Sequence, residues 1–161
     1  DIALQAFLAG PAPDAPRVPG TAIYLTSDPS LVPSALFHNL KHFRVMHAQT
    51  VFLNVVNEEI PYVDAASRLH VRELAPATLA VSVRYGFREE PDLPAALQPL
   101  ACDPMQTTWF IARTNVVDGP GALPRWRCAL FAWMNRQSES AAAYFRLPAN
   151  RVVETGTQVL L

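Results

Sequence analysis

Three polar residues follow the first strongly apolar run of the chain and could contact a ligand. Thr26, Ser27 and Asp28 come directly after the run Ala-Ile-Tyr-Leu that ends at Leu25. In open α/β sheets, ligands bind at the carboxyl ends of the strands, where helix N-termini offer free amides to anions. We therefore predict a ligand site here. The alternative is a helix-entry turn in which Ser27 or Asp28 caps the next helix.

Two histidines, His38 and His42, are four residues apart. On a helix this spacing puts both side chains on one face, with Lys41 nearby. A zinc site needs a third ligand at suitable geometry, and the sequence shows none. The pattern is typical of a solvated helix face, and a surface for a partner or a ligand is the alternative.

A third cluster, Arg84-Tyr-Gly-Phe-Arg88, ends a predicted strand. Gly86 indicates a bulge or a tight bend, because glycine inside a strand pattern usually marks one. The two arginines could hold a phosphate group. A purely structural turn is the interpretation that the pattern favours.

The sequence lacks the motifs on which common enzymes depend. Neither GxGxxG nor a P-loop is present, and Gly119-Pro-Gly121 is not followed by Lys-Ser/Thr. No nucleophile elbow and no Ser, His and acid series stands out. Cys102 and Cys128 form no CxxC pair, so we expect two buried thiols in a reducing compartment and no disulfide or zinc site. A non-catalytic protein without a bound metal is the expectation.

The elements that must position these residues begin with a βαβ unit. Residues 21–26 and 51–56 are continuous apolar runs, typical of strands covered on both faces, as in a parallel sheet. Between them, residues 33–44 carry apolar side chains at helical spacing behind Pro33, a favoured residue at a helix start. The crossover should be right-handed.

The rest of the chain adds an antiparallel hairpin and shorter elements. Apolar and polar residues alternate over 68–72 and 79–85, which predicts a hairpin linked by residues 75–77. The remaining expectations are a short helix at 92–101, a strand at 109–115, helices at 125–136 and 138–145, and a last strand or extended tail at 152–161. The predicted fold class is α/β: a single domain whose mixed sheet, a parallel βαβ core plus an antiparallel hairpin, is flanked by helices.

Composition narrows the class of protein. The 161 residues carry a formal net charge of −1 and 17% charged residues, which argues against nucleic acid as a partner. The sequence has no run of about 20 apolar residues that could cross a bilayer, and its first residues lead us to expect no signal peptide. Four prolines in residues 11–19 predict an extended spacer, and a first residue other than Met suggests a piece of something longer or a processed chain. We expect residues 1–19 to form a helical stub and linker, and residues 20–161 to form the domain.

Five strings, taken in order, give the sequence a recognisable pattern. They are VPGTAIYLT at 18–26, HNLKH at 38–42, RYGFR at 84–88, DPMQT at 103–107 with Trp109-Phe110, and LPANRVVE at 147–154 with GTQV at 156–159. Together they resemble the C-terminal cytoplasmic domain of Kup-type potassium uptake transporters, over about residues 17–161. The resemblance implies potassium uptake, coupled to protons, across a bacterial inner membrane. The ion path would lie in an upstream transmembrane portion, which residues 1–19 would join to the domain.

Three hypotheses follow for the domain itself. The first is a non-catalytic regulatory or assembly domain at the cytoplasmic face, which contacts the transmembrane portion of the same protein and could form a homodimer. The second is a sensor for an adenine-containing nucleotide such as cyclic di-AMP, ATP or FAD. The residues expected to bind it are Thr26, Ser27, Asp28, Asn39, His42, Arg84 and Arg88. The third, a stand-alone enzyme, has no site in the sequence to support it.

Overall fold

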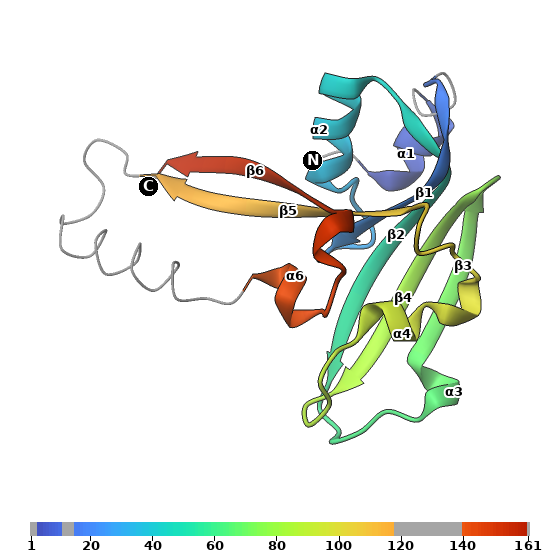
Figure 1. Ribbon diagram of the computed structural model, residues 1–161, viewed down its shortest axis with the longest axis vertical. Coiled ribbons are helices and arrows are strands. Elements are labelled where there is room, and N and C mark those ends of the chain that lie inside the picture. Colours follow the sequence, from blue (N-terminus) through green and yellow to red (C-terminus); the bar gives the residue numbers. More distant parts are fainter. Residues whose placement is uncertain (1–2, 11–14, 118–139, 161) are drawn as a thin grey trace.

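The chain folds around one six-stranded sheet (Figure 1). The structure is a computed structural model, and it describes residues 3–10, 15–117 and 140–160. The strand order is β3-β4-β2-β1-β5-β6, in which β3 pairs antiparallel with β4 and the other neighbours pair parallel. This confirms the predicted α/β class and the mixed sheet. No helix in the described part of the chain is long and apolar enough to cross a membrane.

The centre of the sheet is the predicted βαβ unit. Strand β1 (Arg17–Thr26), helix α2 (Ser34–Phe43) and strand β2 (Met46–Glu58) follow one another, and β1 pairs parallel with β2. Pro33 stands at the N-cap of α2, and the helix ends where Arg44 adopts a left-handed conformation with φ 55°. Strand β1 begins at Arg17, four residues before the expected strand at 21–26, because its first residues pair with the start of β2.

The predicted hairpin is also confirmed. Strands β3 (Leu69–Ala75) and β4 (Thr78–Gly86) pair antiparallel and follow the short helix α3 (Ala65–Arg68). Ala77 takes a positive φ of 58° in the tight link between the two strands. Because β4 also pairs with β2, the hairpin extends the parallel core at one edge.

Two further strands, three short helices and two 3-10 turns complete the described chain. They are α1 (Leu4–Ala9), α4 (Leu93–Ala96), a 3-10 turn (Gln98–Leu100), β5 (Thr107–Val117), α6 (Ala141–Tyr144), a second 3-10 turn (Ala149–Arg151) and β6 (Val152–Leu160). The expected helix at 92–101 is therefore a helical turn followed by a 3-10 turn. Of the expected helix at 138–145, residues 141–144 are helical, and the expected helix at 125–136 lies outside the described residues.

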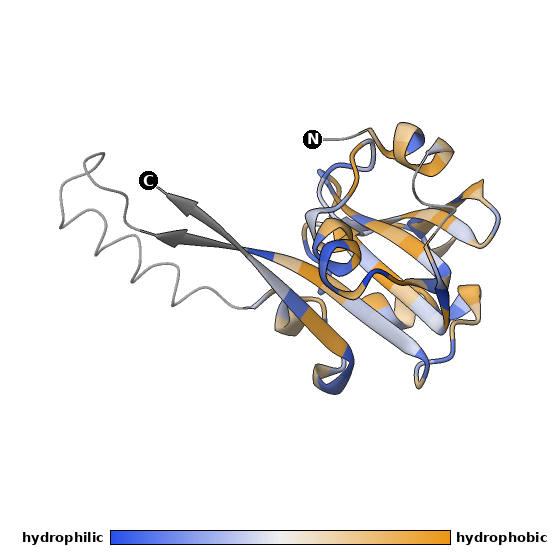
Figure 2. Ribbon diagram, turned by 90° about the horizontal axis from the view of Figure 1, so that it is seen from above, coloured by the Kyte–Doolittle hydropathy of each residue, from blue (hydrophilic) through white to orange (hydrophobic). Residues whose placement is uncertain are grey.

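Both faces of the sheet are buried, which explains the continuous apolar runs. Successive side chains of a strand point to opposite faces, so Tyr24 and Phe52 join one apolar cluster while Ile23 and Leu53 join the other. The body of the sheet is accordingly rich in hydrophobic residues in Figure 2. Helices α1 and α2 supply residues to the first cluster, and α4 supplies residues to the second.

Candidate functional site

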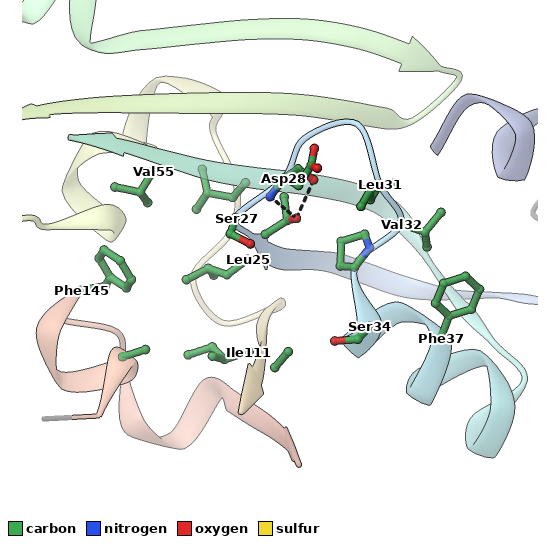
Figure 3. Close-up of a pocket in the computed structure, with 15 residues that line it drawn as sticks. Leu25, Ser27, Asp28, Leu31, Val32, Ser34, Phe37, Val55, Ile111 and Phe145 are labelled. Atoms are coloured by element: carbon green, nitrogen blue, oxygen red, sulfur yellow. Dashed lines mark hydrogen bonds between the residues drawn. The ribbon is translucent and has the colours of Figure 1, made fainter. Parts of the chain in front are cut away.

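A cavity of about 830 Å³ opens at the carboxyl end of β1 (Figure 3). Its wall combines the end of β1 and the following loop, the first turns of α2, and parts of β2, β5 and α6. The lining residues are Leu25, Thr26, Ser27, Asp28, Leu31, Val32, Pro33, Ser34, Phe37, Leu53, Val55, Ile111, Ala112, Ala141 and Phe145. Phe37 and Phe145 lie on opposite sides of the hollow in Figure 3.

The cavity lies where the order of the strands reverses. From β1 the chain passes through α2 to β2 on one side, while β5 pairs with β1 on the other side. Such a switch point separates the loops that leave neighbouring strands, and ligands of open α/β sheets bind there. The position predicted for Thr26, Ser27 and Asp28 at a strand end beside a helix start is confirmed.

Hydrogen bonds hold the loop after β1 in one shape. Asp28 Oδ1 accepts from the Ser30 amide at 2.8 Å and from the Ser30 hydroxyl at 2.6 Å, and both bonds lower the pKa of Asp28. The Thr26 hydroxyl donates to the Asp28 carbonyl at 2.8 Å. Asn54 Nδ2 donates to the carbonyls of Thr26 and Ser27 at 3.1 and 3.2 Å. The loop is therefore an Asx-type turn tied to β2.

The alternative interpretation of these residues as helix caps is wrong. The N-cap position of α2 is Pro33, and no side chain caps the helix. The amides of Leu36 and Phe37 donate to the Pro33 carbonyl, which leaves the Ser34 amide at the cavity wall able to bond a ligand.

The wall of the cavity is mainly apolar and carries one charged side chain, Asp28. Thr26, Ser27 and Ser34 add hydroxyl groups. This set can hold a flat or branched apolar group and a few hydrogen-bonding groups, which is the usual composition of a small-molecule site. Among the lining residues there is no arginine or lysine, so a phosphate here would depend on the Ser34 amide at the start of α2.

Asn39 and His42 lie farther along α2 and do not line the cavity. Asn39 is buried, and its amide donates to the Tyr24 hydroxyl at 3.2 Å and to the Val45 carbonyl at 3.0 Å. Burial raises the pKa of Tyr24, which keeps this phenol neutral. Asn39 therefore ties α2 to β1 and to the loop that follows the helix.

The two histidines share a face of α2, as their spacing predicts. Their rings stack with centroids 6.2 Å apart, and His42 is exposed. The described residues contain no group of three side chains able to hold a metal ion.

The two cysteines differ in what the structure describes of them. Cys102 is a half-buried free thiol whose pKa is raised by burial, and Cys128 lies outside the described part of the chain.

Arg84 lies near the end of β4, and Arg88 lies in the turn after this strand. Neither residue lines the cavity. Arg84 forms an ion pair with Glu58 at 2.9 Å, and Arg88 is exposed. Of the seven residues expected to bind a nucleotide, the structure brings together Thr26, Ser27 and Asp28. The sequence did not indicate the apolar wall, because Phe37 and Phe145 have no local pattern that distinguishes them from core residues.

A second surface lies at the far end of β2 and β4. Ile60, Tyr62 and Phe87, here called the apolar tip, are 50%, 63% and 66% exposed. The amide of Phe87 donates to the Ile60 carbonyl at 3.0 Å, and the Arg88 amide donates to the Pro61 carbonyl at 3.2 Å. These bonds join the loop after β2 to the turn after β4.

Gly86 permits this close approach of the two loops. A Cβ atom at this position would lie 2.4 Å from the Pro61 carbonyl oxygen and 2.5 Å from that of Ile60. No side chain fits there without moving the backbone, so the tight bend predicted at Gly86 has a specific cause.

Comparison with known proteins decides the family. The family model described as "K+ potassium transporter C-terminal domain" matches residues 19–161. The chain belongs to this family. It is 45% identical over 166 residues to the probable potassium transport system protein Kup of Xanthomonas euvesicatoria pv. vesicatoria (strain 85-10), covering 98% of this chain and 26% of that protein.

Further relatives carry the same description. The Kup protein of Zymomonas mobilis subsp. mobilis (strain ATCC 31821 / ZM4 / CP4) is 44% identical over 164 residues, which cover 98% of this chain and 25% of that protein. That of Thiobacillus denitrificans (strain ATCC 25259 / T1) is 48% identical over 149 residues, which cover 89% and 24%. The chain thus spans about a quarter of the length of these relatives. No solved structure matches it.

In this potassium transporter C-terminal domain, the recognised strings contain residues with clear structural roles. Asn39 in the second string ties α2 to β1, and Gly86 in the third allows two loops to meet. In the fourth, Asp103 Oδ1 accepts from the Met105 amide at 2.8 Å, and its carbonyl accepts from the Thr107 hydroxyl at 2.7 Å. The resemblance confirmed by the comparisons is thus carried in part by residues that shape the fold.

Proposed function

We propose that the domain is a non-catalytic regulatory and assembly domain of a potassium uptake transporter. The relatives are named as potassium transport system proteins, and the chain spans about a quarter of their length. In this proposal the ion path and its coupling to protons lie in the remainder of the transporter, in a bacterial inner membrane. The domain lies at the cytoplasmic face, and none of its residues coordinates potassium during transport.

The apolar tip is the observation that carries the proposal. Three large hydrophobic side chains at 50–66% exposure stand on two loops that are joined by backbone hydrogen bonds. Large apolar side chains exposed on adjoining loops are a feature of many contact surfaces. A surface that is already rigid loses little conformational entropy when a partner covers it. The proposed partner is the remainder of the same transporter, which is the largest part of the relatives and lies outside this chain.

The mechanism we propose is a shift of populations. A transporter alternates between conformations, and a domain that contacts one of them more favourably increases the population of that one. The apolar tip would make those differential contacts. The direction of the effect on uptake then depends on which conformation offers the better contact.

The test replaces the apolar tip in the longer transporter that carries this domain. We expect Ile60→Ala combined with Phe87→Ala to change the rate or the potassium dependence of uptake in cells that lack other potassium uptake systems. Because both side chains are exposed, the free energy of unfolding of the domain should change by less than about 1 kcal/mol.

Met105→Ala is the matched control, since Met105 is 69% exposed and lies in the loop before β5. It should leave uptake unchanged. Unaltered uptake kinetics and expression in the Ile60→Ala, Phe87→Ala variant would rule out the tip as the coupling surface.

The cavity beside β1 supports a second candidate function, an adenine-nucleotide sensor. Its volume, its apolar wall and its place at the switch point fit a planar ring system. An adenine ring of cyclic di-AMP, ATP or FAD would lie between Phe37 and Phe145, with ribose hydroxyls near Ser27 and Asp28. Arg84 and Arg88 are not at the wall, so the Ser34 amide at the start of α2 would have to bind a phosphate.

Titration calorimetry with these nucleotides and with adenosine tests the sensor. We expect heat of binding with at least one of them, and loss of that heat in Ala112→Trp, which fills the cavity from an exposed position on β5. Ala48→Trp, at an exposed position of β2 outside the cavity wall, is the control. The absence of heat and of thermal stabilisation across the set would remove this function.

A further inference from the structure

Five exposed residues lie where helix α2 ends and β2 begins. They are Arg17, Lys41, His42, Phe43 and Arg44, here called the basic end. Arg17 belongs to this group because it pairs with Met46, the first residue of β2, which follows Arg44 closely in the chain. The end of α2 and the start of β1 lie together at the top of Figure 1. The side chain of Phe43 is 67% exposed, so an aromatic ring stands among these cations.

Carboxylates do not balance the charge of the basic end. The sequence has no acidic residue between Asp14 and Asp28, and none between Asp28 and Glu58. Among the described residues, four arginines form ion pairs with carboxylates, whereas Lys41 and Arg44 form none. Because the whole chain carries a formal net charge of −1, the basic end is a local concentration of positive charge.

The stability of α2 explains only part of this group. Lys41 and His42 are in the last turn of the helix, where positive side chains interact favourably with the helix dipole. Arg17 lies on a different element, β1, and an exposed Phe43 gains nothing from the dipole. Cations around an exposed aromatic ring are typical of protein surfaces that bind to anionic bilayers.

We propose that the basic end binds the anionic surface of a lipid bilayer. Lys41 and Arg44 contact lipid phosphates, and each such cation increases the affinity about fivefold. The ring of Phe43 enters the boundary between headgroups and acyl chains. The inference rests on the proposed place of the domain beside a bacterial inner membrane, and it adds the surface of the domain that contacts the lipid.

The basic end and the apolar tip lie at opposite ends of β2. The basic end precedes Met46, and the tip follows Glu58. At about 3.3 Å per residue, the 13 residues of this strand separate the two surfaces by roughly 40 Å. Both surfaces are in contact when β2 lies along the membrane, since the tip then reaches the transporter while the basic end lies on the surrounding lipid.

Cosedimentation of the 161-residue chain with lipid vesicles tests the proposal. We expect binding to vesicles that contain phosphatidylglycerol and none to vesicles of phosphatidylcholine alone. Lys41→Gln combined with Arg44→Gln should lower the affinity about tenfold or more. Arg72→Gln combined with Arg88→Gln is the matched control, because both arginines are exposed elsewhere and the net charge changes equally. It should leave the affinity unchanged, and circular dichroism verifies that both variants fold.

Failure to bind the anionic vesicles would overturn the proposal, as would equal binding to both kinds of vesicle. An equal loss of affinity in the two double variants would contradict it too, because net charge alone would then govern binding. Inorganic phosphate at the concentration of the lipid phosphate should not displace the chain. Displacement would indicate a site for a free anion and would also overturn the proposal.

A fluorescent label shows which surface contacts the bilayer. An environment-sensitive NBD group at Phe43→Cys, in a chain with Cys102→Ser and Cys128→Ser, should become brighter when anionic vesicles are added, because it enters a less polar environment. The same label at Phe87→Cys, on the apolar tip, should not change, although Phe87 is as exposed as Phe43. The reverse pattern, or no change at either position, would exclude the basic end as the lipid contact. Uptake by tip variants tests the regulatory proposal separately, so either proposal can fail alone.

Discussion

Glu89 organises the apolar tip through one carboxylate that accepts three hydrogen bonds. It receives the Gly86 amide at 2.6 Å, the Val63 amide at 3.1 Å and the Arg68 guanidinium at 2.5 Å. The guanidinium also lies 5.0 Å from the centre of the Tyr85 ring. These hydrogen bonds lower the pKa of Glu89, and the bond from Arg68 makes the largest contribution. The charged form of Glu89 therefore stabilises the two loops that present the tip.

This role makes the stability of the domain sensitive to acid. Because the pKa of Glu89 is lower in the folded than in the unfolded chain, its contribution is complete above the ordinary carboxyl value of 4.5 and is lost as the pH falls through the folded value. Glu89→Gln keeps the shape of the side chain without the charge. We expect the urea midpoint of the variant to lie below that of the wild type at neutral pH and to fall less steeply as the pH is lowered past 4.5.

Glu90→Gln is the control for this measurement. Glu90 is 78% exposed and forms an ion pair with Arg146 on the surface, where such pairs contribute little. The urea midpoint of this variant should change with pH as that of the wild type does. If Glu89→Gln and the wild type lost stability in parallel as the pH fell, Glu89 would not be the acid-sensitive group.

At the scale of elements, local pattern explains the parts of the fold that could be predicted. The runs at 21–26 and 51–56 and the helix between them are confirmed, because two buried faces demand continuous apolar residues and Pro33 favours a helix start. The hairpin is confirmed because alternation marks a strand with one wetter face. The ends of the strands depend on their pairing partners. Strand β1 begins at Arg17 because Arg17 pairs with Met46 of β2.

The candidate site was only partly predictable, because register is a tertiary property. Thr26 pairs with Asn54, but β2 continues past that residue to Glu58, which pairs with Gly86. The end of β4 therefore lies beyond the end of β1, and Arg84 forms its ion pair with Glu58 away from the cavity. No spacing in the sequence reveals this offset between strands.

At the scale of the molecule, three candidate surfaces lie at different strand ends. The cavity opens at the carboxyl end of β1, the apolar tip lies beyond the ends of β2 and β4, and the basic end lies where β1 and β2 begin. Binding at the cavity and binding at the apolar tip would therefore involve different residues.

The extent of the domain can be tested at its N-terminus, where α1 precedes the residues that the family model matches. Leu4 and Phe7 of α1 are each 3% exposed and belong to the same apolar cluster as Tyr24 and Leu36. The Phe7 ring also meets the Phe37 ring edge-on, with centroids 6.2 Å apart. We therefore expect α1 to be part of the domain.

We expect Phe7→Ala to lower the free energy of unfolding by about 3 kcal/mol, because it removes a buried aromatic ring and leaves a cavity beneath α1. Gln5→Ala, at an exposed position of the same helix, should change it by less than about 0.5 kcal/mol. Urea unfolding of the 161-residue chain followed by circular dichroism measures both values. Equal stability of the two variants would show that α1 is a stub outside the core, and the domain would then begin with β1.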